Sequence, residues 1–247
     1  MTFAVCTSFN DEGYELYGKK FLETYRKYWP EYIPLHVFYE GTKPKEHWPV
    51  YHDLLQDGGL RKFLSAYGSN PIANGITGKK NDKFVVNFRF QAVKFCKKVF
   101  AISSPSASDA DWWIWLDADV VTEKKITTEF LKSVCPDGYS ASYLGRKEYP
   151  HSECGWVAYS KRYRGDFLKK FREIYESGQV FFFREWHDSF IFDALRSEFE
   201  YKGYRFYNLS PEAKGLDAWS ASPLADVMTH NKGPKAKKEA YEPLQPA

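Results

Sequence analysis

The sequence predicts a single α/β domain in which a mixed, mainly parallel sheet is flanked by helices. The chain of 247 residues is 43% hydrophobic and 19% aromatic, which suffices for a large core and excludes a disordered protein. Its N-terminal part places a helical pattern between two short apolar runs, as in a β-α-β unit. Its most strand-like stretch, residues 112–116, ends abruptly in two aspartates. In open α/β sheets, ligands bind at that carboxyl end.

The β-α-β opening occupies the first forty residues. A buried strand is expected at residues 3–7, a helix at 14–29, where apolar residues recur at helical spacing, and a strand at 35–39. Residues 42–83 are expected to be less regular, because Gly, Asn and Pro occur close together near their end.

The rest of the chain continues the alternation of helices and strands. A helix at 84–100 carries one apolar stripe and leads to the strand at 112–116. Further helices are expected at 127–134, 164–177 and 188–199, and further strands at 139–144, within 151–160 and at 204–207. One domain is therefore expected over residues 1–233, followed by a flexible Lys- and Pro-rich tail at 234–247.

Charge and cysteine content narrow the class of protein. The net charge of +3 neither requires nor excludes a polyanionic partner. Four widely separated cysteines argue against a structural zinc site and a disulfide scaffold, and they favour a reducing compartment. The N-terminus lacks a signal-peptide pattern, and no run of 18 apolar residues occurs. If the sequence is complete, a cytoplasmic protein without a membrane span is expected.

Asp117 and Asp119 are the strongest candidates for chemistry. They follow the apolar strand with one residue between them, and on an extended chain both side chains would point to the same side. Two adjacent carboxylates repel each other, so a divalent cation is their natural partner. Oxygen ligands suit Mg²⁺ or Mn²⁺, which commonly bind substrate phosphates as well. An ordinary polar turn after a strand is the plain alternative.

One stretch of the sequence resembles the Asp-x-Asp region of GT-A glycosyltransferases, NFRFQAVKFCKKVFAISSPSASDADWWIWLDADVV. Within that group, it is most similar to the glycogenin-like and xyloglucan-xylosyltransferase-like enzymes. The β-α-β opening, the ECGWVAY segment and a late histidine in MTHNKG fit in order. The resemblance implies the GT-A fold and the transfer of a hexose or pentose from a nucleotide-diphosphate sugar. UDP is the expected nucleotide, since metal-dependent members of this fold usually use it.

The resemblance also implies a metal centre that binds Mn²⁺ or Mg²⁺. Asp119 would be the principal ligand, Asp117 would bind directly or through water, and His230 would be the third protein ligand. Lys232 would face the leaving diphosphate and Arg89 the donor, where positive charge favours departure of the leaving group. Surface charges and a surface histidine are the plain alternatives.

Contacts to the nucleotide and to the sugar are expected from two further groups of residues. By topology and resemblance, the nucleotide would lie across the first two strand ends, at Thr7, Ser8, Phe9 and Glu40. The sugar side would involve Glu153, Gly155, Trp156, Glu185, Trp186 and Asp188. Gly155 would allow close approach of the backbone, and a Trp could stack on a sugar ring. Asp188, with Glu185 second, would be the catalytic carboxylate, as a general base or as a stabiliser of positive charge. A helix N-cap is the alternative for Asp188.

Two other functions compete. The pattern LDADVVT also fits haloacid-dehalogenase-like phosphatases, in which Asp117 would be the nucleophile, although those enzymes carry the motif near the N-terminus. A non-catalytic nucleotide- or sugar-binding protein is the other possibility. The acceptor is left open among a glycan, a protein and modified nucleic acid.

Overall fold

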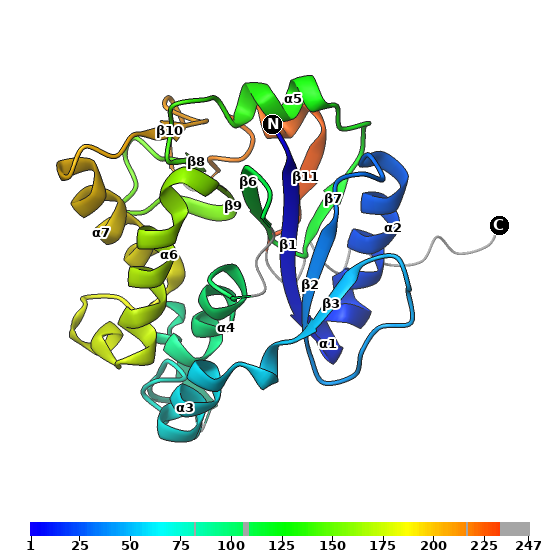
Figure 1. Ribbon diagram of the computed structural model, residues 1–247. Helices are drawn as coiled ribbons and strands as arrows, with labels where there is room; N and C mark the ends of the chain where they lie inside the picture. Colours follow the sequence, from blue (N-terminus) through cyan, green and yellow to red (C-terminus); the bar gives the residue numbers. More distant parts are fainter. Residues whose placement is uncertain (82, 106–108, 216, 233–247) are drawn as a thin grey trace.

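The computed structural model describes residues 1–81, 83–105, 109–215 and 217–232. At its centre is a seven-stranded sheet in the order β10-β8-β9-β6-β1-β2-β3 (Figure 1). Strand β9 runs antiparallel to both of its neighbours, and the other neighbouring pairs are parallel. The predicted α/β class with a mixed, mainly parallel sheet is therefore confirmed. The strands of this sheet are β1 (Phe3–Asn10), β2 (Leu35–Glu40), β3 (Val50–Asp53), β6 (Trp112–Leu116), β8 (Ala141–Leu144), β9 (Glu153–Ser160) and β10 (Phe206–Asn208).

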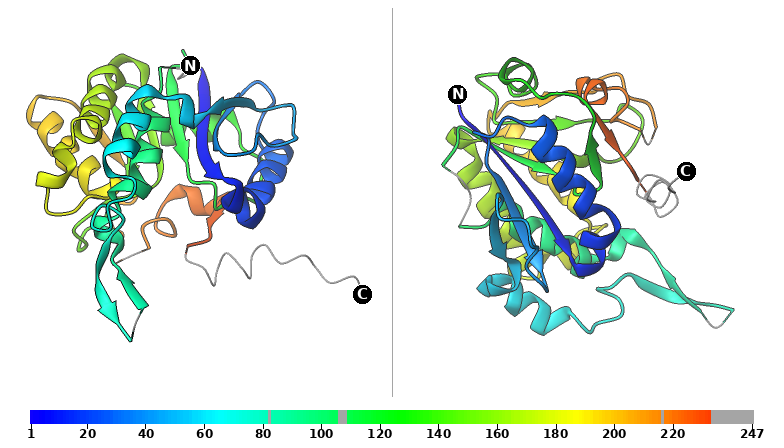
Figure 2. Two further views of the ribbon diagram at one scale, coloured as in Figure 1. Left: turned by 90° about the horizontal axis from the view of Figure 1, so that it is seen from below. Right: turned by 90° about the vertical axis from the view of Figure 1, so that its right-hand side faces the viewer.

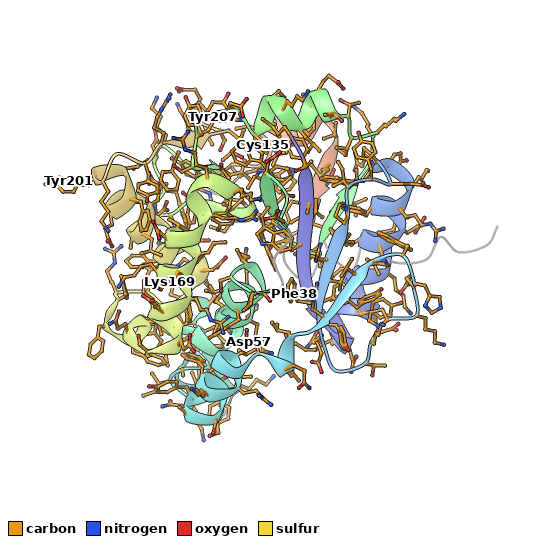
Figure 3. The ribbon with its side chains drawn as sticks, viewed as in Figure 1. Phe38, Asp57, Cys135, Lys169, Tyr201 and Tyr207 are labelled. Carbon is orange, nitrogen blue, oxygen red and sulfur yellow. The ribbon has the colours of Figure 1, made fainter. Side chains whose placement is uncertain are left out.

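Helices cover both faces of the sheet. One face carries α3 (Gly58–Tyr67), α4 (Ala92–Ile102), α6 (Lys161–Glu176) and α7 (Asp188–Tyr201), and the other carries α2 (Lys19–Tyr28) and α5 (Thr128–Val134) (Figures 1 and 2). Short helical segments complete the chain: α1 (Asp11–Gly13), η1 (Tyr14–Gly18), η2 (Leu54–Gln56), η3 (Phe88–Phe90), η4 (Gln179–Phe182) and η5 (Pro223–Asp226). Two hydrophobic cores result, one on each face. Phe38 belongs to the first and Cys135 to the second (Figure 3).

The sequence WWIWL forms β6 because both faces of this strand are covered. Trp113 and Trp115 belong to the core beneath α4 and α6, whereas Trp112, Ile114 and Leu116 belong to the core beneath α2 and α5. A strand that is buried on both faces is apolar at every position. β6 therefore places the following Asp117 rigidly at the carboxyl edge of the sheet.

The predicted helix at 84–100 is wrong in its first half. Residues Lys83–Val86 form β5, which pairs with β4 (Ile76–Lys80) in an antiparallel hairpin that projects from the body (Figure 2). Its side chains Phe84 and Val86 are exposed. Two adjacent β-branched valines favour a strand, and the Asn87 side chain then accepts a hydrogen bond from the Arg89 N–H. Helix α4 consequently begins only at Ala92.

Other differences are smaller. Residues 42–83 are more regular than expected, because they contain β3, α3 and β4. The first helix begins as a π-helical turn, η1, before α2. The later predicted helices and strands are present, with boundaries shifted by a few residues. The tail expected at 234–247 lies outside the described residues. No helix in the described ranges is both long and apolar enough to cross a membrane.

Candidate active site

Two short strands bring Asp119 and His230 together, although 111 positions separate them in the sequence. After β6, the chain turns through residues 117–119, where the Val120 N–H donates to the Asp117 carbonyl, and continues as β7 (Val120–Thr122). Strand β11 (Met228–His230) pairs antiparallel with β7, so that His230 lies opposite Val120. The Asn231 N–H donates to the Asp119 carbonyl and extends this pairing. The strand-like residues before His230 are thus what position its imidazole.

The three predicted metal ligands converge. His230 Nε2 lies 3.0 Å from Asp119 Oδ1 and 3.7 Å from Asp117 Oδ2, and one donor atom from each side chain falls within 4.8 Å of the others. The side chain of His230 is only 5% exposed, so it is not a surface histidine. Two carboxylates and an imidazole are a ligand set that suits Mn²⁺ at least as well as Mg²⁺. These residues fit the divalent cation that the sequence predicts.

The two oxygens of Asp117 have different surroundings. Oδ1 accepts hydrogen bonds from Lys98 Nζ at 3.0 Å and from Trp115 Nε1 at 2.6 Å, whereas Oδ2 faces His230. The carboxylate is therefore held in one orientation, and Oδ2 is the oxygen available to a cation. The two aspartates meet across a turn, not along the extended strand from which their proximity was predicted.

Glu153 and Gly155 on β9 support His230. The Oε1 of Glu153 lies 3.0 Å from His230 Nδ1, which leaves Nε2 for the aspartates. A Cβ on Gly155 would come within 2.5 Å of His230 Cε1, so only glycine leaves room for the ring. Carboxylates commonly orient metal-binding histidines in this way. Both residues were predicted to contact sugar, and here they contact the histidine.

The charges around His230 shift two pKa values. Burial alone would lower the pKa of His230, but its contacts with Asp119 and Glu153 raise it to about 9. Burial would likewise raise the pKa of Glu153, but His230 and Lys232 lower it to about 2. Lys232, with its side chain 42% exposed, forms an ion pair with the other Glu153 oxygen. The cluster is thus built from ionised partners that compensate each other.

Lys98 on α4 connects the aspartate pair to the predicted catalytic carboxylate. Its ammonium contacts Asp117 Oδ1 at 3.0 Å, Asp188 Oδ2 at 2.9 Å and the Cys154 carbonyl at 2.5 Å. Burial would lower the pKa of Lys98, but the two carboxylates hold it above its usual value. Asp188 is the buried first residue of α7, and the N-cap is His187, so the N-cap alternative for Asp188 is wrong.

Glu185 lies in a buried cluster with two histidines. Its Oε2 is 3.1 Å from His151 Nε2 and 3.0 Å from His187 Nε2, and Arg89 Nε lies 3.7 Å away. A backbone hydrogen bond holds Arg89 beside Glu185, because the Arg89 carbonyl accepts from the Trp186 N–H. Arg89 belongs to η3 and not to the helix before β6. Trp186 is half-buried and packs edge-on against Phe90.

The residues predicted to meet the nucleotide lie at the carboxyl ends of β1 and β2. Thr7 and Phe9 are buried, and Ser8 is half-buried. Glu40 forms an ion pair with Lys97 at 2.6 Å. Trp156 is fully buried in the core beneath α2 and α5, so the structure does not bring its ring to the site.

Three groups of residues near the site were not found from the sequence. They are Lys98, the histidines His151 and His187, and Tyr17 on η1. Burial raises the pKa of Tyr17 to about 12, and the charges of Asp119 and Asp117 act in the same direction. A lysine within the apolar helix before the Asp-x-Asp strand was a usable signal for Lys98. No local pattern marks the histidines, since loops bring them together.

Comparison with known proteins identifies the fold. No family model and no curated protein matches the chain. Among solved structures, mouse xyloside xylosyltransferase 1 in its apo form matches with a TM-score of 0.51 at 11% identity, over 92% of each chain.

Two further matches are more distant. A glycosyltransferase involved in glycosylation of the major capsid of PBCV-1 has a TM-score of 0.46 at 12% identity, over 97% of this chain and 100% of that one. The apo form of GlyE from Streptococcus pneumoniae has a TM-score of 0.45 at 10% identity, over 85% of this chain and 46% of that one. At such low identity, the likeness to the mouse enzyme concerns the fold, and the chain has the mainly parallel α/β fold of GT-A glycosyltransferases.

Proposed function

We propose that this protein is a metal-dependent glycosyltransferase that moves a sugar from a UDP-sugar to a hydroxyl acceptor. The observation that carries the proposal is the convergence of Asp117, Asp119 and His230 at the carboxyl edge of the sheet. The fold supports it, because the carboxyl edge is where nucleotides bind in open α/β sheets.

The residues of the site have separable roles in this reaction. Asp119, Asp117 and His230 would hold Mn²⁺ or Mg²⁺, which when bound offsets the negative charge of the diphosphate leaving group. Lys232, partly exposed beside the metal cluster, would add positive charge at the diphosphate. Thr7, Ser8, Phe9 and Glu40 would face the nucleotide, and Arg89 and Trp186 the donor sugar.

In the transfer itself, the bond between the anomeric carbon and the diphosphate oxygen breaks, and the acceptor oxygen bonds to that carbon. The acceptor proton passes to a base. Asp188 would be this base in an inverting reaction or would stabilise the developing positive charge in a retaining one. Its ion pair with Lys98 holds it beside the aspartate pair. Glu185 would orient the sugar through its cluster with His151 and His187.

The competing functions gain no support in the described residues. A phosphatase would need Asp117 as an in-line nucleophile, yet its Oδ1 accepts two hydrogen bonds and its Oδ2 faces His230. A non-catalytic binding protein would have no need for the buried Lys98–Asp188 pair beside the aspartates.

Calorimetry of UDP binding tests the proposal. We expect UDP to bind with Mn²⁺, and EDTA or Asp119→Ala to abolish binding. Asp137→Ala is the matched control, since this aspartate is exposed on a loop after α5. If UDP fails to bind in every condition, the UDP-sugar donor is refuted. If UDP does bind, hydrolysis of UDP-sugars by the wild type, lost in Asp188→Asn, tests the catalytic carboxylate.

A further inference from the structure

A polar cavity with a volume of ≈ 240 Å³ lies beside the candidate site. It is bounded by the end of β8, residues 145–152, α7 and the end of β10. This volume is below the roughly 300–1,000 Å³ of pockets for drug-sized ligands, so it would hold one small ring and not an extended chain. Its walls include Arg146, Tyr149, His151, Asp193, Arg196 and Asn208.

Two buried side chains on this wall have polar atoms without a hydrogen-bond partner among the described residues. Arg146 donates from Nη1 to the His151 carbonyl and from Nη2 to Glu153, but its buried Nε–H has no acceptor. The side chain of His151 is 3% exposed, and its Nδ1 is also unpaired. Its Nε2 lies 3.1 Å from Glu185 but lacks the alignment of a hydrogen bond. Buried polar groups are normally satisfied, so these atoms point to a ligand with oxygen atoms.

The charges on the wall are already balanced, which argues against an anionic ligand. Arg146 is paired with Glu153 at 2.9 Å, and Arg196 with Asp193 at 3.0 Å and Glu200 at 2.8 Å. Each guanidinium group thus already has a carboxylate partner, and Glu153 also pairs with Lys232. A further carboxylate or phosphate would gain no net attraction there, whereas a neutral ligand that carries hydroxyl groups would not be penalised.

The aromatic part of the wall fits a sugar ring. Tyr149 packs edge-on against His151 with the ring centres 5.6 Å apart, and the Arg146 guanidinium lies 5.0 Å from its ring centre. Tyr149 is therefore an aromatic side chain fixed beside polar donors, and small-molecule sites usually combine these two features.

His151 connects the wall of the cavity to the predicted catalytic carboxylate through a series of side-chain contacts. This ring contacts Glu185, which contacts His187, and His187 directly precedes Asp188. We infer that the cavity binds the terminal neutral sugar of a glycan acceptor, with Arg146 Nε and His151 directed at its hydroxyl groups. This inference rests on the proposed function and selects a glycan from the acceptors that the sequence left open.

Saturation-transfer NMR on the full chain tests the inference. The probes are the methyl glycosides of glucose, galactose and xylose, with methyl glucuronide as an anionic comparison. We expect transfer to at least one neutral glycoside and none to the glucuronide. Ser197→Trp, at the exposed rim of the cavity, should weaken binding of the neutral glycoside at least tenfold. Ser133→Trp, at an exposed position on α5, should leave it unchanged.

Three results would overturn the inference: no neutral glycoside binds, the glucuronide binds as well as the neutral probes, or Ser197→Trp binds like the wild type. UDP calorimetry with Mn²⁺ on the same variants distinguishes failure of this inference from failure of the proposed function. Ser197→Trp should bind UDP and Mn²⁺ normally, because Ser197 is exposed at the rim of the cavity and is not one of the predicted metal ligands. If the wild type binds neutral glycosides but not UDP, the cavity is confirmed as a sugar site and the donor assignment fails.

Discussion

The imidazole of His230 lies against the backbone of Gly155, with no space for a side chain between them. An ideal Cβ on Gly155 would be 2.5 Å from His230 Cε1 and 2.8 Å from Nδ1. Such distances are shorter than any real carbon contact, and His230 is enclosed by Glu153 and the aspartates, so it cannot simply move aside. The glycine on β9 therefore determines where the third predicted metal ligand lies.

Gly155→Ala should displace His230 from the aspartates and weaken Mn²⁺ binding by about 10- to 100-fold, the usual effect of disturbing the support of a metal ligand. Isothermal titration with Mn²⁺ measures this change. Gly165→Ala on α6 is the control, since its Cβ would meet no atom within 4 Å. That variant should keep Mn²⁺ affinity and gain up to about 1 kcal/mol of stability from helix propensity. Equal Mn²⁺ affinity in the two variants would contradict the role of Gly155.

Glu153→Gln should weaken Mn²⁺ binding by about tenfold or more, because a neutral amide no longer supports His230 through its Nδ1. The substitution also leaves Arg146 and Lys232 without their shared counter-charge. Titration with Mn²⁺ again provides the measurement, and Glu148→Gln, at an exposed position in the loop before β9, is the control. An unchanged Mn²⁺ affinity would show that Glu153 does not orient the histidine.

Lys98→Met should destabilise the metal-free protein by about 3–5 kcal/mol, because Asp117 and Asp188 lose the buried cation between them. Chemical denaturation in EDTA measures the free energy of unfolding. Lys94→Met on the exposed side of the same helix should change stability by no more than about 0.5 kcal/mol. Adding Asp188→Asn to Lys98→Met should recover part of the loss, since one uncompensated charge is removed. Additive losses in the double variant would mean that the two residues are not coupled.

The sequence predicted an element correctly where the residues of that one segment determine its conformation. The strand at 112–116 was predictable because five consecutive apolar residues between a polar turn and two aspartates favour a fully buried strand, and all five are buried in the structure. The hairpin of β4 and β5 was not predictable, because Phe84 and Val86 are apolar yet exposed, and hydrophobic periodicity assumes that apolar residues are buried.

In the candidate site too, contacts within one segment were predictable, and contacts between distant segments were not. Asp117 and Asp119 are two residues apart, so their proximity followed from the local chain. The histidine at 230 was assigned by resemblance, and its contact with Asp119 depends on the pairing of β7 with β11. Lys98 and Asp188 meet only because α4 and α7 pack on the same face of the sheet. Trp156 was expected on the sugar side of the site, but its register opposite Leu116 on β6 directs its ring into the core.

A partly buried pair of histidines on the neighbouring strands β2 and β3 should make stability depend on pH. His36 Nδ1 and His52 Nε2 are 2.9 Å apart, and the rings stack with centres at 5.2 Å. Burial disfavours the charged ring of His36, and the charge of a protonated His52 adds to this, so the pKa of His36 falls to about 4. In the unfolded chain, the pKa of this histidine is about 6.5.

The sign of the pH effect follows from these two values. Between pH 6.5 and about 4, the unfolded chain binds a proton that the folded protein excludes, so the free energy of unfolding decreases as the pH falls through this window. Denaturation at pH 7, 6, 5 and 4 should therefore show a loss for the wild type that is smaller for His36→Gln. His47→Gln, at an exposed position, should follow the wild type. If His36→Gln keeps the full wild-type slope, proton exclusion by this pair is not what weakens the fold at low pH, and other buried groups must account for it.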